Sequence, residues 1–424
     1  MTSRWSRLRV RVAVFVFVML VPCKGLFAYS VLTHEEIVDL LWTSEIRPLL
    51  LQRFPALTKD QIKEAHGYAY GGSVIQDLGY YPFGNKEFSD LVHYVRSGDF
   101  VLELLRQSHD VNEYAFALGA LSHYTADIDG HPAVNQAVAL RYPKLRAKYG
   151  SSVRYAQDTT AHLKTEFGFD TLQVAKNRYA SDQYHDFIGF NVALPLLERT
   201  FTVVYGLKLQ DVLAHEDLAV GSYRFSVSRL IPQMTKVALQ THKKDLMRET
   251  PDFAKSKFLY RLSRSDYERA WGRTYTKPDF GTRVLAVLLR YIPKVGPFKG
   301  MGFDNPTPQT EDLYIKSINT TVDQYRLYLE QVHAGTLVLP NCDLDDGKTT
   351  KAAEYTLADK TYANLLDRLT TQKFEGTSPQ LRDNILGFYS DLSLPIETRK
   401  DPARWQSVLT DLGELRAVAP APAM

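Results

Sequence analysis

Helical periodicity is the feature that most limits what this chain can fold into. Apolar residues recur every three or four positions in several long segments, whereas alternating strand patterns are few and short. One segment, residues 200–204, is ambiguous between helix and strand. We therefore predict an all-α protein with long connecting loops. The clearest helical segments are residues 37–41, 114–126, 212–247, 312–332, 355–369 and 381–392.

Histidines and carboxylates are spaced along the predicted helices in a way that can bind metal. His123 and Asp127 are four residues apart, as are His162 and Glu166. Residues with this spacing project from one face of a helix. His131 lies four residues after Asp127, beyond a glycine where the helix is expected to end or distort. Each pair alone is more typical of a surface hydrogen bond, but the combined set of imidazoles and carboxylates suits zinc.

Three further residues upstream can join this set. His34, Asp77 and His93 supply two more imidazoles and one more carboxylate. The residue before His34 has a second interpretation, because Thr33 followed by Glu36 is also the pattern of a helix capping box. That interpretation does not compete with a ligand role for His34.

The N-terminal 28 residues have the pattern of a secretory signal peptide. Four arginines precede an apolar run at residues 12–21, and small residues lie just before Tyr29. The run is about half of the roughly 20 residues that span a bilayer. We predict cleavage after Ala28 and export to the periplasm or the extracellular space, with an uncleaved membrane anchor as the alternative.

Removal of residues 1–28 changes the charge and the cysteine content. The chain has a net charge of +3, and the five positive side chains of this segment have no acidic counterpart, so the mature protein has a net charge of −2. Electrostatics therefore give no reason to expect nucleic-acid binding. Cys23 leaves with the segment and Cys342 remains alone, which excludes an internal disulfide and a thiolate metal cluster.

The ordered residues resemble the ligand series of the zinc-dependent phospholipase C and P1-type nuclease superfamily. Three strings, at residues 33–37, 126–131 and 162–170, look closest to the branch that contains glycosylphosphatidylinositol-specific phospholipase D. The resemblance covers about residues 29–170. Two departures exist: Tyr29 replaces the tryptophan common in bacterial phospholipases, and the spacing from Asp127 to His131 is shorter than in P1-type nucleases. The matching residues are Tyr29, His34, Asp77, His93, His123, Asp127, His131, His162 and Glu166.

The resemblance implies a multi-helix domain with three zinc ions and phosphodiester hydrolysis. One zinc would be held by His131, His162 and Glu166. A second would be held by His34 and by the amino nitrogen and carbonyl of Tyr29, and Asp127 would bridge it to a third, held by Asp77, His93 and His123. Asp77 is also the candidate for orienting or deprotonating the attacking water. The expected substrate is a phospholipid head group; a P1-like single-strand nuclease and a non-catalytic zinc-binding exported protein are the alternatives.

The remaining sequence suggests how the chain is divided. We predict a signal peptide (1–28), a catalytic domain (29–250), a helical C-terminal extension (251–417) and a disordered tail (418–424). The apolar segment 284–289 and the basic residues after it could contact a membrane surface, although a buried helix with basic ends is favoured. Residues 341–347 resemble a calcium loop but lack its sixth-position glycine and its final glutamate, so we interpret them as a turn.

Overall fold

The computed structural model describes residues 31–176, 190–231 and 304–418. The predicted signal peptide, Tyr29 and the segment 284–289 lie outside these residues. The predicted boundary between residues 250 and 251 also lies outside them, so the division into two domains stays a prediction.

The described residues are mainly helical and include only one short pair of strands, which confirms the all-α class. The helices of the first half are α2 (Val31–Leu41), α3 (Arg47–Arg53), α4 (Lys59–Gly72), α5 (Lys86–Tyr94), α6 (Ser97–Gln107), α7 (Val111–Arg141), α8 (Pro143–Tyr149) and α9 (Thr159–Ala175). Those that follow are α11 (Leu194–Tyr205), α12 (Leu209–Val212), α13 (Glu216–Phe225), α17 (Pro308–Ala334), α18 (Thr356–Thr371), α19 (Pro379–Phe388) and α20 (Pro402–Ala417). A short antiparallel pair joins β1 (Cys342–Asp343) to β2 (Lys348–Thr349), with Cys342 opposite Thr349.

Short helical turns connect several of these helices. Among the described residues, two have the wider π geometry, at Trp42–Ile46 and Ser226–Leu230, and three have the tighter 3₁₀ geometry, at Ile75–Tyr80, Tyr155–Gln157 and Glu397–Lys400. Within the described ranges, no helix is both long enough and apolar enough to cross a membrane.

The predicted helices agree with the structure except at some boundaries. Residues 200–204 belong to α11, which ends at Gly206 in the left-handed region with φ 67°. The pattern at 212–247 is interrupted between α12 and α13, and its part beyond residue 231 lies outside the described residues. Helix α7 does not end at Gly130 but continues to Arg141. Thr33 is not the N-cap of α2, because the helix already includes Val31 and Leu32. The Thr33 hydroxyl instead donates to Asp170.

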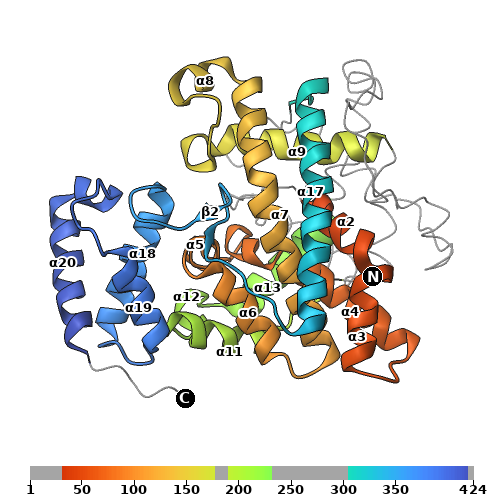
Figure 1. Cartoon of the computed structure of the whole chain (residues 1–424), viewed down its shortest axis with the longest axis horizontal. Coiled ribbons are helices and arrows are strands. Elements are labelled where there is room, and N and C mark those ends of the chain that lie inside the picture. Colours follow the sequence, from red (N-terminus) through yellow and green to blue (C-terminus); the bar gives the residue numbers. More distant parts are fainter. Residues whose placement is uncertain (1–30, 177–189, 232–303, 419–424) are drawn as a thin grey trace, which may run out of the picture.

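Helix α7 lies at the centre of the fold. It packs against α2, α4, α6, α9 and α17, and α17 runs alongside it (Figure 1). Helices α18, α19 and α20 form a group to one side, and α18 packs on α5 (Figure 1). Because α7 is covered by helices from both ends of the chain, its residues 114–127 are all buried. Polar side chains on this stretch are therefore removed from water.

Helices α4 and α7 approach each other closely through glycine. A Cβ atom added at Gly119 would lie 2.0 Å from the carbonyl oxygen of Ala69, and one at Gly72 would lie 2.0 Å from that of Phe116. Only residues without a side chain allow this contact. The close approach brings the backbone of Ser73, at the end of α4, next to His123 of α7.

Replacing Gly119 by alanine should therefore destabilise the protein, although alanine is the better helix former. The added methyl group overpacks a backbone contact, which typically costs about 1–3 kcal/mol. Gly413 in α20 is the matched control, because a Cβ there meets nothing within 4 Å. Gly413→Ala should instead stabilise by roughly 0.5–1 kcal/mol. Urea unfolding of the two variants measures both changes, and equal effects would contradict the close packing.

Candidate metal centre

Three of the predicted ligands project from the buried face of α7. His123, Asp127 and His131 follow one another at intervals of four residues, and none is more than 1% exposed. The Nε2 atom of His123 lies 3.1 Å from Oδ2 of Asp127. One helix therefore presents three ligand-capable side chains to the interior of the protein.

The first group of ligand-capable atoms joins α2 to α7. It consists of His34, His123 and Asp127, which offer atoms within 4.8 Å of one another. The His34 ring stacks on the His123 ring with centroids 4.4 Å apart, and its Nε2 atom lies 3.7 Å from Oδ1 of Asp127. The first turn of α2 is held by Asp170, whose Oδ2 atom accepts a hydrogen bond from the Leu32 amide at 3.0 Å.

The second group joins the turn at residues 75–80, helix α5 and α7. Asp77, His93 and His123 offer atoms within 4.8 Å of one another. Nε2 of His93 lies 3.5 Å from Oδ1 of Asp77 and 3.4 Å from Oδ2 of Asp127. His123 thus belongs to two groups, and Asp127 lies between them. The turn that carries Asp77 is attached to α7 by a 3.0 Å hydrogen bond from Gln76 to the Ala120 carbonyl.

The third group joins α7 to α9. His131, His162 and Glu166 offer atoms within 4.8 Å of one another, and all three are buried. Nδ1 of His162 lies 3.4 Å from Oε1 of Glu166. Helix α9 begins at an Asp158 cap, whose carboxylate accepts the Ala161 amide at 2.9 Å. The cap fixes where α9 starts and hence where His162 and Glu166 lie along it.

Backbone carbonyls orient three of the imidazole rings. In each case one ring nitrogen donates to a carbonyl, so in the neutral form of the ring the other nitrogen carries no proton and can bind a metal. The three contacts are His93 Nδ1 to Ser89 at 2.7 Å, His123 Nδ1 to Ser73 at 2.9 Å and His162 Nε2 to Val153 at 2.6 Å. An oriented ring with a fixed tautomer is the arrangement that surrounds metal-binding histidines in proteins.

Most carboxylate oxygens of these groups lack hydrogen bonds from the described residues. Neither oxygen of Asp77 or Asp127 has a hydrogen-bond partner among those residues, nor has Oε2 of Glu166. Burial raises the pKa of Asp77 and of Glu166 well above the usual range, and neighbouring carboxylates raise both further. Burial acts in the same direction on Asp127, but His123 and His93 outweigh it and hold its pKa well below the usual range.

Bound cations would supply the partners that these carboxylate oxygens lack. An uncompensated buried charge is costly, and proteins pair such charges or use them to coordinate metals. The donor set is imidazole nitrogen and carboxylate oxygen, which fits zinc. The residues present therefore fit the metal that the sequence predicts.

The structure brings together eight of the nine predicted ligands. His34, Asp77, His93, His123, Asp127, His131, His162 and Glu166 make up the three groups, and Tyr29 lies outside the described residues. His66, which matched no motif, contacts Asp39 at 2.8 Å and stacks on Trp42, in agreement with a structural role. His109 is exposed and belongs to none of the groups.

Comparison with known families agrees with this arrangement. Residues 33–211 match the family model described as zinc dependent phospholipase C. This part of the chain is therefore similar to the zinc-dependent phospholipase C family. The matched segment contains all three groups of ligand-capable residues. Searches of curated proteins and of solved structures found no significant match. The likeness to the phospholipase D branch remains a prediction.

Sequence reasoning missed Asp345, which lies beyond the family segment. This buried side chain comes from the loop after β1, and its Oδ1 atom is 3.5 Å from Nε2 of His131. The turn predicted at residues 341–347 is present, because the Gly347 amide donates to the Asp343 carbonyl at 2.9 Å. The only sequence signal was the density of aspartates at 343–346.

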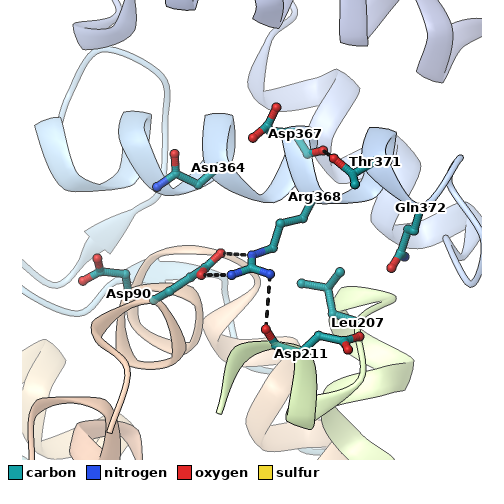
Figure 2. Close-up of a pocket in the computed structure, with 9 residues that line it drawn as sticks. Asp90, Leu207, Asp211, Asn364, Asp367, Arg368, Thr371 and Gln372 are labelled. Atoms are coloured by element: carbon teal, nitrogen blue, oxygen red, sulfur yellow. Dashed lines mark hydrogen bonds and ion pairs between the residues drawn. The ribbon is translucent and has the colours of Figure 1, made fainter. Parts of the chain in front are cut away.

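A separate cleft of about 800 Å³ lies between α5, α12 and α18. Arg368 of α18 donates to both oxygens of the Glu87 carboxylate. It also reaches across the cleft to the Asp211 carbonyl at 3.2 Å (Figure 2). No residue of the three metal-binding groups lines this cleft. Its polar contacts connect α18 to α5 and α12.

Proposed function

We propose that this protein is a zinc-dependent phosphodiester hydrolase that removes head groups from phospholipids in the manner of a phospholipase C. The observation that carries the proposal is the convergence of three buried imidazole and carboxylate groups within the segment that matches the zinc-dependent phospholipase C family. A structural core with incidental histidines would not leave the carboxylates of Asp77 and Asp127 without hydrogen bonds from the described residues.

The residues of these groups would hold three zinc ions. His131, His162 and Glu166 would hold one ion, and Asp77, His93 and His123 would hold another. His34 and the N-terminal residue Tyr29 would hold the third, with Asp127 available to the second and the third. Bound zinc lowers the pKa of coordinated water to about 7 and neutralises charge on phosphoryl oxygens.

The chain's own residues orient the reaction. Asp77 would orient or deprotonate the attacking water, either as a metal ligand or from just outside the metal ligands. Ser73, Ser89 and Val153 keep His123, His93 and His162 in the tautomers that leave a ring nitrogen for metal. Burial of the group excludes bulk water, which strengthens each electrostatic contact with a developing charge.

The proposed location follows from the signal-peptide pattern of residues 1–28, and the proposed partner follows from the phospholipase C-like function. The chain is exported, residues 1–28 are removed, and Tyr29 becomes the N-terminal residue that can offer its amino nitrogen to zinc. The substrate is presented by a phospholipid surface. Residues 251–417 form an extension of the catalytic domain.

An assay of mature protein against matched substrates tests the proposal. Phosphatidylcholine vesicles and single-stranded DNA are incubated with the protein, with and without a zinc chelator, and released phosphocholine and nucleotides are measured. We expect the protein to release phosphocholine, and we expect the chelator to prevent this release. Chelator-sensitive cleavage of the DNA alone would make the protein a nuclease, and hydrolysis of neither substrate by zinc-loaded protein would contradict phospholipase activity.

A further inference from the structure

The loop after β1 is attached to the family segment by a series of hydrogen bonds. The Ser97 hydroxyl donates to the Cys342 carbonyl at 2.6 Å and accepts the Cys342 amide at 3.0 Å. The Leu344 amide donates to the carbonyl of His93 at 3.2 Å, and Asn135 donates to the carbonyl of Asp345 at 2.9 Å. Contacts with α5, α6 and α7 therefore fix where the loop lies.

The C-terminal end of the same loop, at Gly347, lies close to helix α7. Gly347 has a φ of 71°, and a Cβ atom added there would lie 2.3 Å from the carbonyl oxygen of Ile128. Pro132 has no amide hydrogen to give to that carbonyl, so its helical hydrogen bond is missing. The loop thus rests against α7 within one turn of His131.

Two tyrosines hold the Asp345 side chain by one oxygen. Its Oδ2 atom accepts from the Tyr94 hydroxyl at 2.9 Å and from the Tyr355 hydroxyl. Its Oδ1 atom has no hydrogen-bond partner among the described residues and lies 3.5 Å from Nε2 of His131. A buried carboxylate oriented in this way has one oxygen available for a further interaction.

The distance from Oδ1 of Asp345 to His131 fits two ligands of one metal ion better than it fits a hydrogen bond. A hydrogen bond from nitrogen to oxygen is usually about 2.7–3.2 Å, so 3.5 Å is too long for a good one. Two ligand atoms about 2.0–2.1 Å from one tetrahedral zinc are about 3.4 Å apart. The pair of His162 and Glu166 in the same group has this separation, at 3.4 Å.

We propose that Asp345 is the fourth protein ligand of the metal held by His131, His162 and Glu166, an inference that rests on the proposed zinc function. A tetrahedral zinc with four protein ligands has no open position and is structural. This ion therefore attaches the loop at 341–347 to α7 and α9, while the water-activating positions belong to the groups around His123. The C-terminal segment completes the metal centre from outside the family segment.

The test compares Asp345→Asn with Asp346→Asn by elemental analysis of the full-length mature protein. The asparagine side chain of the first variant retains an oxygen for the tyrosines but is a neutral and much weaker ligand. The second variant makes the same chemical change in the same loop, where the Asp346 side chain contacts Arg154 at 3.2 Å. We expect Asp345→Asn to lose about one zinc per chain, or to bind it at least about tenfold more weakly, and Asp346→Asn to match the wild type.

A second readout distinguishes a ligand from a residue that only positions His131. Cobalt replaces zinc in both proteins, and the visible absorption of each is recorded at saturating metal. A changed spectrum in Asp345→Asn supports direct ligation, whereas an identical spectrum overturns it even if the affinity falls. Unchanged zinc content and affinity in Asp345→Asn also overturn it, while a wild type without zinc would contradict the proposed function itself.

Discussion

Replacing His123 by asparagine should remove zinc and phosphodiester hydrolysis together. His123 is the residue that the groups around His34 and Asp77 have in common, and its Nε2 atom faces Asp127 at 3.1 Å. Asparagine can still donate to the Ser73 carbonyl but has no atom in place of Nε2. Even partners outside the metal ligands change affinity by about 10–100-fold, so the loss of a shared ligand should exceed about 100-fold.

The measurement for this variant is zinc content and hydrolysis at a fixed free zinc concentration. His109→Asn is the control, because His109 is exposed and belongs to no group. The far-ultraviolet circular dichroism of His123→Asn should match that of the wild type, which separates loss of metal from loss of the fold. Full zinc content with hydrolysis close to that of the wild type would contradict the role of His123.

Replacing Asp77 by asparagine should lower kcat by about 10²–10⁴-fold, the usual contribution of a general acid or base. Both oxygens of Asp77 lack hydrogen-bond partners among the described residues, and burial together with Asp127, Glu166 and Asp345 raises its pKa. A carboxylate whose oxygens have no partner in the protein can accept a proton from a water molecule placed beside it. Asparagine has nearly the same shape but cannot accept that proton.

The control for Asp77 is a nearby carboxylate outside the metal groups. Asp90 on α5 contacts Lys86 and belongs to none of them, so Asp90→Asn should keep most of the activity. Zinc content of Asp77→Asn, measured in parallel, reports whether Asp77 is also a ligand. A kcat close to that of the wild type would exclude Asp77 from the chemistry.

Helices were predictable where the apolar pattern is long, and their ends were not. Segments 114–126 and 312–332 lie inside α7 and α17. The β-branched residues at 200–204 belong to α11, because tertiary burial outweighs a weak local preference for strand. Gly130 and Pro132 did not end α7, since neighbouring elements cover the helix at this point.

The metal-binding groups were predictable to the extent that they depend on local spacing. Pairs four residues apart, such as His123 with Asp127, share a helix face whatever the rest of the chain does. Asp345 could not be found in this way, because it meets His131 from a distant part of the sequence, beyond α17. The carbonyls of Ser73 and Ser89 that orient the rings could not be predicted either, since every residue has a backbone carbonyl and the sequence does not show which ones face a histidine.

Zinc content is the property on which the proposed function depends, since the buried imidazole and carboxylate groups are proposed to hold this metal. Elemental analysis of exported, N-terminally sequenced protein, purified without chelators and dialysed against metal-free buffer, tests it most directly. We expect two or three zinc ions per chain and an N-terminus at Tyr29. Less than one zinc per chain, unchanged when His123 is replaced, would contradict it.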